Sequence, residues 1–307
     1  IFAILNEQSY SVQELCQLFD VRQPNMSHHL KLLNEQGLIA AHKEGNRMYY
    51  AQAVQFPEQV EVVVEALRAQ SEQWLLPEVV LEQAQLIDNS RAQSSQQFFE
   101  KNSETFQQNQ ELIVAASQYY PTVLELVKSL GLSVHAKVAE VGVGEGGFLT
   151  QLLALFESVT AVEYAPVMLA KAKAQLEQEG LAERIHWVQA DIQRAQTWQF
   201  FDAIVLNMVL HHLPSPAQAI KNMAKMLALG GVIVLCDLVQ HEQAWAQTHC
   251  GDLWMGFDPE QLHRWMRQQG LIHENLVFSG LRNGFQVFYS VYRKPQAVET
   301  QKVVSAR

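Results

Sequence analysis

The sequence predicts two structural parts: an α/β domain built on a Rossmann-like parallel sheet, and a smaller α+β domain of helix-turn-helix type before it. Three observations support this prediction. A glycine-rich turn, KVAEVGVGEGGF at 137–148, joins an apolar strand to a helix. Apolar strands and amphipathic helices then alternate to about residue 269. The first seventy residues instead contain short helices followed by two short strands.

Length, charge and cysteine content limit the class of protein. With 307 residues, each of two domains can bury a core of its own. The formal net charge of −10 excludes an extended basic coat, so a nucleic acid would need a local surface. The sequence has no apolar run of transmembrane length, and its three cysteines are too few for a disulfide framework. We therefore expect a cytoplasmic protein with no membrane contact. The chain begins at Ile1 rather than Met, and we expect residues before it.

The N-terminal residues predict three helices. An apolar-periodic helix covers 1–8, and a second at 11–19 begins with a capping box made by Ser11 and Glu14. A third helix at 25–36 carries an apolar stripe on one side and polar residues on the other. Two helices joined by a short turn, the second with a polar outer face, are typical of a helix-turn-helix.

Two short strands, 38–41 and 48–50, flank the sequence KEGNR and predict a hairpin wing. The stretch QPNMSHHLKLLNEQGLIAAHKEGNRMYY resembles the winged helix of ArsR-type bacterial transcriptional regulators. This resemblance covers about the first seventy residues and implies binding of double-stranded operator DNA. It places the following residues at the major groove or on the flanking backbone: Gln23, Asn25, Ser27, His28, Lys31, Lys43 and Arg47.

Within this set, we expect Gln23 and Asn25 to read base edges, while Lys31 and Arg47 supply salt-dependent affinity. The first fifty residues hold four basic residues against five acidic ones, which leaves open a winged helix that only dimerises. Cys16 is expected to be a core thiol rather than a metal ligand. His28 and its neighbour His29 point about 100° apart on a helix, so we expect one to face DNA and the other the core.

The region after the wing connects the two parts. A helix at 56–68 has the apolar stripe Val60, Val63, Val64 and Leu67. In ArsR-type dimers the corresponding helix packs across a two-fold axis, so we expect a homodimer; packing on the larger domain of the same chain is the alternative. The first helix of such domains, the other half of that interface, is expected to be truncated here.

A polar stretch, 75–109, predicts a helical connector, followed by a helix at 122–130. The expected divisions are 1–70 for the helix-turn-helix domain, 71–130 for the connector and 131–307 for the α/β domain. Aromatic residues before the glycine-rich turn are candidates for a lid over a ligand, with ordinary core packing as the alternative: Phe98, Phe99, Tyr119 and Tyr120.

The ligand of the glycine-rich turn can be argued from charge. Glu163 ends the next apolar strand, about twenty residues on, where a ribose-binding acid belongs. A dinucleotide would place its pyrophosphate beside Glu140 and Glu145, which repel it. S-adenosylmethionine (SAM) carries a sulfonium and an ammonium, which suit carboxylates. The motif E-x-G-x-G-x-G resembles motif I of class I SAM-dependent methyltransferases, and an antiparallel hairpin over 275–292 after the parallel strands is typical of that fold.

The resemblance extends over about 98–294 and implies SAM as cofactor and S-adenosylhomocysteine (SAH) as product. It implies that Glu163 accepts hydrogen bonds from both ribose hydroxyls, that Asp191 accepts from the adenine amino group, and that Asn207 lies beside the methionine end. The full set of cofactor residues implied is Glu140, Gly142, Gly144, Gly146, Glu163, Tyr164, Asp191, Ile192, Asn207 and Met208.

Candidate catalytic and metal-binding residues are few. His211 and His212 follow the fourth strand, and His212 is a weak candidate for a general base; the alternative is that orientation suffices and no base is needed. We expect no metal, because the spacing of Asp237, His241, His249 and Cys250 matches no tight motif. The N-P-P-Y signature of base methylation and the paired cysteines of arsenic methylation are absent, which disfavours both reactions.

The sequence thus predicts a bacterial fusion of an ArsR-like winged helix with a class I methyltransferase domain. Three hypotheses remain. The chain is a regulator whose DNA binding responds to SAM, SAH or a small-molecule methyl acceptor; or a small-molecule methyltransferase whose winged helix only dimerises; or a SAM and SAH sensor without turnover.

Overall fold

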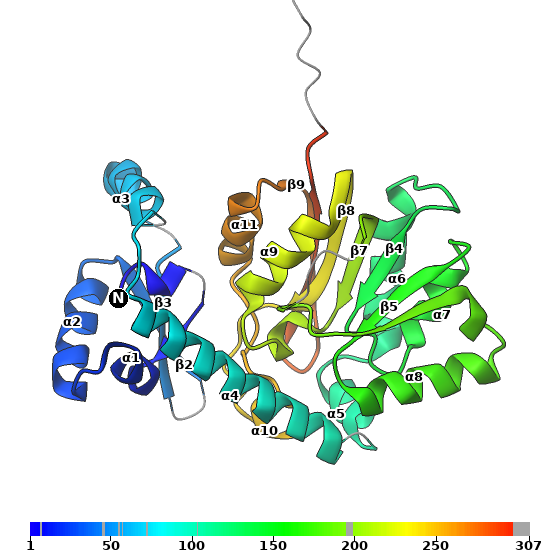
Figure 1. Cartoon of the computed structure of the whole chain (residues 1–307), viewed down its shortest axis with the longest axis horizontal. Coiled ribbons are helices and arrows are strands. Elements are labelled where there is room, and N and C mark those ends of the chain that lie inside the picture. Colours follow the sequence, from blue (N-terminus) through cyan, green and yellow to red (C-terminus); the bar gives the residue numbers. More distant parts are fainter. Residues whose placement is uncertain are drawn as a thin grey trace, which may run out of the picture.

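A computed structural model describes residues 1–6, 8–44, 47–54, 56, 58–71, 73–102, 104–194 and 199–296. Figure 1 shows a small N-terminal domain and a larger domain, joined by the long helix α4. The elements before α4 are η1 (Ile4–Asn6), β1 (Tyr10–Ser11), α1 (Val12–Phe19), α2 (Gln23–Glu35), β2 (Ile39–Glu44), β3 (Arg47–Gln52) and α3 (Glu58–Ser71). The connecting helices are α4 (Glu78–Asn102), α5 (Phe106–Ile113) and α6 (Ala116–Ser129).

The helix-turn-helix and its wing confirm the prediction for the small domain. Ser11 caps α1, since its Oγ accepts from Glu14 N at 3.3 Å and Glu14 Oε2 accepts from Ser11 N at 2.7 Å. β2 and β3 pair antiparallel as the hairpin. The predicted first helix is wrong: only the single turn η1 forms, because the chain then extends as β1 and pairs with β3, giving the sheet order β1-β3-β2.

The core of the small domain includes part of the connector. Leu15, Met26 and Leu30 are buried together with Val80 and Ile87 of α4. Cys16 packs against this cluster, as expected of a core thiol. The N-terminal half of α4 is therefore a structural helix of the small domain rather than a free spacer.

The larger domain has the predicted class I methyltransferase architecture. Its seven-stranded sheet has the order β6-β5-β4-β7-β8-β10-β9, in which β6, β5, β4, β7 and β8 are parallel and β10 is antiparallel to both neighbours. The strands are β4 (Val138–Val141), β5 (Val159–Glu163), β6 (Ile185–Gln189), β7 (Phe201–Asn207), β8 (Leu227–Leu238), β9 (Ile272–Gly280) and β10 (Gln286–Arg293). The remaining helices are α7 (Gly147–Leu153), α8 (Pro166–Gln178), η2 (Ala182–Arg184), η3 (Leu210–His212), α9 (Pro216–Met226), α10 (Trp245–His249) and α11 (Pro259–Gln268).

Two apolar clusters cover the two faces of this sheet. One gathers side chains of α6, α7 and α8, and the other gathers side chains of α9 and α11. The central strand β4 is buried throughout, which explains why its sequence is a continuous apolar run interrupted only by Glu140. The carboxyl ends of β4, β5 and β7 meet at one edge, where open α/β sheets bind ligands.

The two domains touch through rings and backbone groups. Tyr49 of β3 lies edge-on to Trp254 with ring centroids 6.1 Å apart, and Trp265 Nε1 donates to Asn6 O at 3.0 Å. Arg264 donates to Ala53 O at 3.2 Å. Among the helices described, none combines the length and apolar character that crossing a bilayer requires.

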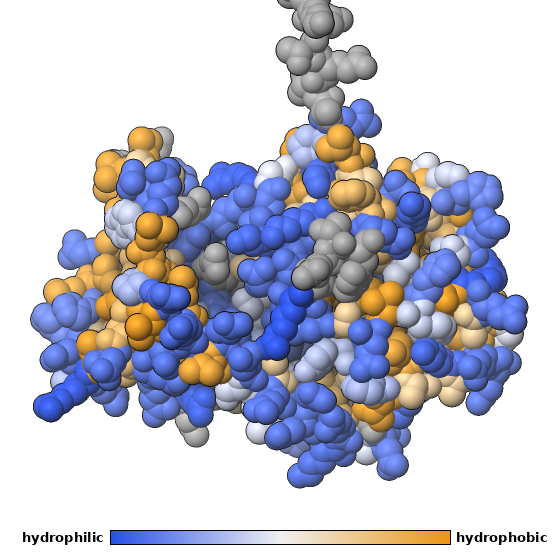
Figure 2. All heavy atoms as spheres, viewed as in Figure 1, coloured by the Kyte–Doolittle hydropathy of each residue, from blue (hydrophilic) through white to orange (hydrophobic). Residues whose placement is uncertain are grey.

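Helix α3 leaves several apolar side chains exposed. Val64 is buried and Leu67 packs on the N-terminal core, whereas Val60, Val62 and Val63 are 43%, 80% and 69% exposed. Figure 2 shows apolar side chains over the region that Figure 1 labels α3. The predicted stripe is therefore only partly used within the chain.

Candidate cofactor cavity and nucleic-acid face

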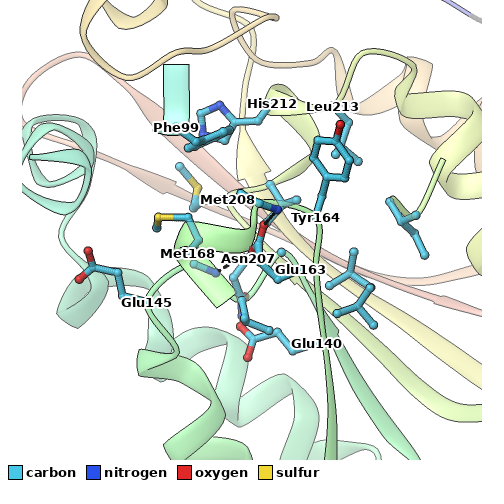
Figure 3. Close-up of a pocket in the computed structure, with 18 of the residues that line it drawn as sticks. Phe99, Glu140, Glu145, Glu163, Tyr164, Met168, Asn207, Met208, His212 and Leu213 are labelled. Carbon is cyan, nitrogen blue, oxygen red and sulfur yellow. Dashed lines mark hydrogen bonds between the residues drawn. The ribbon is translucent and has the colours of Figure 1, made fainter. Parts of the chain in front are cut away.

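A cavity of about 320 Å³ lies at the carboxyl edge of β4, β5 and β7. Helices α4, α5 and α6 contribute the opposite walls. Its volume is that of a small-molecule site. Figure 3 shows Glu140 at one end of the cavity and Phe99 with His212 at the other.

Every predicted cofactor residue except Gly146 lines this cavity: Glu140, Gly142, Gly144, Glu163, Tyr164, Asp191, Ile192, Asn207 and Met208. Gly146 is the N-cap residue of α7 with φ +89°, and a Cβ there would lie 2.8 Å from Leu176 Cδ2. Its glycine allows the close packing of α7 on α8, and its contact with the cofactor stays a prediction. At Gly144 a Cβ would meet nothing within 4 Å, which leaves the turn open toward a ligand.

Glu163 is fixed at the end of β5 by backbone donors. Its Oε1 accepts from Ala165 N at 2.9 Å, and its Oε2 accepts from Gly144 N at 3.3 Å. These bonds tie the carboxylate to the glycine-rich turn and set its orientation. Burial raises the pKa of Glu163, while the hydrogen bonds from Ala165 and Gly144 oppose that shift. The remaining lone pairs can accept two hydroxyl protons.

Glu140 and Asn207 form the polar floor of the cavity. Asn207 Nδ2 donates to Glu140 Oε1 at 3.3 Å. Among the described residues, neither Glu140 Oε2 nor Asn207 Oδ1 has a hydrogen-bond partner. Burial raises the pKa of Glu140 to about 8 against the Asn207 hydrogen bond, with the charge of Glu163 adding to the rise. Two unsatisfied buried acceptors at one point favour a ligand that brings a donor or a cation.

Asp191 follows β6 and faces the same cavity. Its Oδ1 accepts from Gln193 N at 2.9 Å, and its Oδ2 lies 3.6 Å from Arg194 Nε. The neighbouring Ile192 is buried, and its carbonyl accepts from Asn222 Nδ2 at 2.9 Å. One carboxylate and one apolar side chain thus lie side by side at the cavity.

The charge of the cavity selects between classes of nucleoside ligand. The described residues that line it include five carboxylates and no lysine or arginine; the acids are Glu111, Glu140, Glu145, Glu163 and Asp191. Such a wall suits a sulfonium and an ammonium and opposes a pyrophosphate. The residues present therefore fit SAM and do not fit a dinucleotide.

Three of the four predicted lid aromatics line the cavity, namely Phe99, Tyr119 and Tyr120. Phe98 does not: its ring packs on Gly251, where a Cβ would lie 2.3 Å from Phe98 Cδ1. Ala92, Ser95 and Gln110 also line the cavity and were not among the predicted residues. The adjacent Phe98 and Phe99 in the otherwise polar helix α4 indicate that this face of the helix is covered.

The two histidines after β7 have different surroundings. His211 Nδ1 lies 2.6 Å from Asp237 Oδ1, and His211 Nε2 lies 3.7 Å from Asp252 Oδ1. Burial lowers the pKa of His211, but the charges of Asp237 and Asp252 outweigh it and raise it to about 9. Burial and the positive His211 lower the pKa of His212 well below its usual value. His211 is thus a buried cation and His212 a neutral imidazole.

The residues considered for a metal are not brought together. His249 bonds Trp245 O at 3.1 Å and Cys250 Sγ donates to Asn109 O at 3.3 Å, whereas Asp237 pairs with His211. In the described part of the chain, the group of His211, His212 and Asp252 has its ligand-type atoms within 4.8 Å of one another. A protonated His211 repels a cation and offers no lone pair, so we keep the prediction that no metal binds.

The predicted DNA-facing residues are all exposed: Gln23, Asn25, Ser27, His28, Lys31, Lys43 and Arg47. Figure 1 shows α2 on the side of the small domain away from the larger one. Glu14 is withdrawn from this surface into the α1 cap and an ion pair with Arg91 at 2.8 Å. The expectation that His28 or His29 faces the core is wrong: both are exposed, because Met26 and Leu30 fill the core side of α2.

Comparison with protein families agrees with this division of the chain. The family described as "Bacterial regulatory protein, arsR family" matches residues 1–41. The family described as "Methyltransferase domain" matches residues 139–235.

Curated relatives match part of the chain. Nodulation protein S of Sinorhizobium fredii is 31% identical over 109 residues, which cover 34% of this chain and 49% of that protein. The ubiquinone biosynthesis O-methyltransferase of Xanthomonas axonopodis is 27% identical over 170 residues, covering 51% of this chain and 71% of that protein. The chain thus spans about half the length of the nodulation protein that it matches.

Solved structures agree in fold alone. The [4+2]-cyclase SpnF superposes with a TM-score of 0.51 at 17% identity, covering 59% of this chain and 82% of that one. A putative sarcosine dimethylglycine methyltransferase from Galdieria sulphuraria also gives 0.51, at 15% identity, with 59% and 87% covered. Because a cyclase and a methyltransferase fit equally well, the chemistry has to be argued from the site.

Proposed function

Because the chain is a fusion of an ArsR-type winged helix-turn-helix domain with a class I SAM-dependent methyltransferase domain, we propose that it is a DNA-binding transcriptional regulator whose DNA affinity responds to the ligand of the methyltransferase cavity. The ligand is SAM, its product SAH, or a small methyl acceptor bound beside them. This role fits a cytoplasmic location, where operator DNA and SAM are both available.

One observation supports this proposal most: α4 contributes side chains both to the core of the winged helix domain and to the lining of the cofactor cavity. Its N-terminal half places Val80 and Ile87 in the core of the winged helix domain. Its C-terminal half places Ala92, Ser95 and Phe99 on the cofactor cavity. A ligand that contacts the second half therefore acts on a helix that the DNA-binding domain is built around, and a rigid element of this kind can couple two sites.

Arg91 lies at the point where α4 passes from one domain to the other. Its guanidinium donates to Glu14 Oε1 at 2.8 Å and to Ser9 O at 3.2 Å in the small domain. It also donates to Pro214 O at 3.4 Å, and Pro214 lines the cavity. The same group stacks 4.7 Å from the Trp254 ring. One side chain thus joins the α1 cap to the loop that follows η3.

Different residues of the cavity would contact different parts of the cofactor. Glu163 would hold the ribose hydroxyls, Asp191 and Ile192 the adenine, and Glu140 with Asn207 the cationic methionine end. When bound, SAM supplies a methyl group that a nucleophile takes up in a new bond while the sulfur keeps the electron pair of the broken S–CH₃ bond. Enzymatic turnover on a small molecule is supported by the O-methyltransferase name of one relative. Radiolabelled methyl transfer to candidate acceptors distinguishes an enzyme from a sensor.

The deciding experiment measures DNA affinity with and without cofactor. A duplex obtained by in vitro selection against the whole chain is titrated by fluorescence anisotropy in buffer, in SAM and in SAH. We expect Kd to differ at least about fivefold between two of these conditions, the lower end of typical allosteric coupling. The affinity for SAM or SAH must then change by the same factor when DNA is saturating. Equal Kd values in all three conditions would contradict the regulation of DNA binding by SAM or SAH.

The exposed valines of α3 support a homodimer. A second copy would cover Val60, Val62 and Val63, which this chain leaves in solvent. Replacing Val62 and Val63 with Glu should shift the mass measured by light scattering from dimer to monomer and weaken DNA binding. Val277→Glu, a partly exposed valine on β9, is the control and should leave the mass unchanged. A monomeric wild type would contradict this assignment.

A further inference from the structure

The end of the cavity farthest from Glu140 has a chemistry that the cofactor does not use. Phe99 of α4 lines it, together with His212 and Leu213 from the segment after β7 (Figure 3), and Gln110 of α5 lies against His212. Figure 3 shows Phe99 and His212 next to each other at this end. The rings of Phe99 and His212 meet edge to face with centroids 5.3 Å apart. Besides these rings, the subsite brings two polar atoms together, His212 Nε2 and Gln110 Nε2, which lie 2.9 Å apart.

The hydrogen bonds of His212 fix which of its nitrogens carries the proton. Its Nδ1 lies 3.2 Å from Gly251 O, and a carbonyl oxygen can only accept, so Nδ1 is the protonated nitrogen. Gln110 Nε2 lies 2.9 Å from His212 Nε2, and the amide NH₂ can only donate. His212 Nε2 therefore bears a lone pair directed at the cavity wall, where the Gln110 amide covers it.

The neighbouring His211 keeps the lone pair of His212 unprotonated. The rings of His211 and His212 lie 4.1 Å apart between centroids, so both cannot be positively charged at low cost. Asp237, 2.6 Å from His211, stabilises the charge on His211. The low pKa of His212 agrees with this division of charge. His211 thus acts as a positioning residue that holds His212 neutral.

Charge then limits what can bind at His212 Nε2. The ionised carboxylates of the cavity, with no lysine or arginine among its described lining residues, oppose an anion. An ammonium group at this position would exchange its water shell for the single lone pair of His212 Nε2, which is costly in a buried site. An uncharged donor is the group that satisfies both conditions, and the aromatic walls favour a flat apolar body.

We propose that this end of the cavity is an acceptor subsite for a neutral hydroxyl compound of the phenol class, whose O–H displaces the Gln110 amide and donates to His212 Nε2. The inference rests on the proposed function, since it names the methyl acceptor of the same site. It assigns Gln110 as a competitor for the lone pair and His212 Nε2 as the acceptor of the hydrogen bond from the hydroxyl group.

A set of ring compounds that differ in one group tests the proposal by binding alone. Phenol, anisole, benzoate and benzylamine are titrated calorimetrically into the whole chain, with and without SAH. We expect phenol to bind about tenfold or more tightly than the other three, since anisole lacks the donor and the others carry a charge. Equal affinity for phenol and anisole would overturn the proposal. Tighter binding of benzoate or benzylamine would overturn the charge argument.

Two variants separate a binding role from a structural one. His212→Phe should lower phenol affinity to the level of anisole. Gln110→Leu should raise phenol affinity several-fold, because the lone pair then has no amide to displace; a merely structural role predicts a loss. Gln97→Leu, the same change at an exposed position of α4, should leave phenol affinity unchanged. A fall in phenol affinity in Gln110→Leu would overturn the assignment.

Binding of SAH in the same titrations keeps this proposal separate from the proposed function. If SAH binds to wild type and both variants while phenol and anisole bind alike, the subsite is wrong and the cofactor assignment stands. If SAH fails to bind, the proposed function is wrong, and the comparison among the four ring compounds still decides the nature of the subsite.

Discussion

The cofactor cavity and the DNA-facing surface are built in opposite ways. The cavity gathers buried acids that are already tied to the backbone, as Glu163 is to Gly144 and Ala165. The surface presents exposed polar and basic side chains, of which Lys31 and Arg47 are the clearest. The first is preorganised for a small cation, whereas the second can adapt to a large anion. We therefore expect that substitutions in the cavity cause large losses of SAM affinity at single positions. Substitutions on the surface should cause graded, salt-dependent losses of DNA affinity.

The largest effect is expected for Glu163→Ala. The change removes the acceptor for both ribose hydroxyls, and hydrogen bonds to charged groups contribute about 1.5–3 kcal/mol each, so SAM affinity should fall at least about 100-fold. Calorimetry measures the loss. Glu157→Ala, an exposed carboxylate beside His135, is the control and should bind SAM normally. Cofactor-free DNA affinity should not change; a large loss of it would mean that the carboxylate holds the fold together.

The next largest effect is expected for the DNA-facing surface of the small domain. The double change Lys31→Ala and Arg47→Ala should weaken DNA binding by about ten- to a hundredfold at moderate salt, and should lower the slope of log K against log salt by about 2, since each cation neutralises one phosphate. Anisotropy titrations over a salt series measure both quantities. The matched change Lys128→Ala with Lys173→Ala, on the larger domain, should alter neither. An unchanged slope would remove these residues from the DNA interface.

A pH series sharpens the description of the cavity. Burial raises the pKa of Glu140 to about 8, so its carboxyl group is mostly neutral at pH 7. A cationic ligand needs its ionised form, so SAM affinity should rise with pH, by up to about tenfold per unit, and level off above about pH 8. Glu140→Gln should flatten this rise, whereas Glu145→Gln, on the same cavity and paired with Lys171, should keep it. A wild-type affinity independent of pH between 6 and 8 would contradict a neutral Glu140.

The same group should affect folding stability in the opposite direction. Its folded pKa of about 8 lies above the ordinary value of 4.5, so the folded state holds the proton more tightly. The stability contribution is full below about pH 4.5 and is lost as pH rises toward about 8, at no more than about 1.4 kcal/mol per pH unit. Denaturant titrations of the cofactor-free protein and of Glu140→Gln across this range measure the difference. A wild-type slope equal to that of the variant would show that Glu140 does not contribute.

Sequence reasoning succeeded where the signal was local. The Ser11 capping box, the glycine-rich turn and the acid at the end of β5 each lie within a few residues of the element that they define, and the structure has all three. It failed where partners are distant. Gln110 meets His212 across 102 positions, and Arg91 meets Glu14 across 77. No periodicity encodes such pairs, because they depend on how finished domains pack.

Helix α4 shows why the middle of the chain was the hardest part to predict. Its apolar residues do not follow one stripe, since Val80 and Ile87 face the small domain while Ala92 and Phe99 face the cavity. A helix that packs against two partners on different sides has a weak amphipathic pattern, so its sequence predicts a polar connector. The mixed pattern was a sign of its double contact rather than of a missing core.

The smallest expected effect is the one that decides whether the two regions communicate. Arg91→Met keeps the apolar stem on Trp254 but removes the donors to Glu14, Ser9 and Pro214. SAM affinity and DNA affinity, each measured alone, should change by less than about threefold, because the residue touches neither ligand. The ratio of DNA Kd values with and without SAM should move toward one, since the connection between the α1 cap and the cavity loop is lost. Lys101→Met, an exposed cation of the same helix, should preserve the wild-type ratio. If Arg91→Met also preserves it, coupling passes through the apolar contacts of α4 instead, and the guanidinium only stabilises the domain interface.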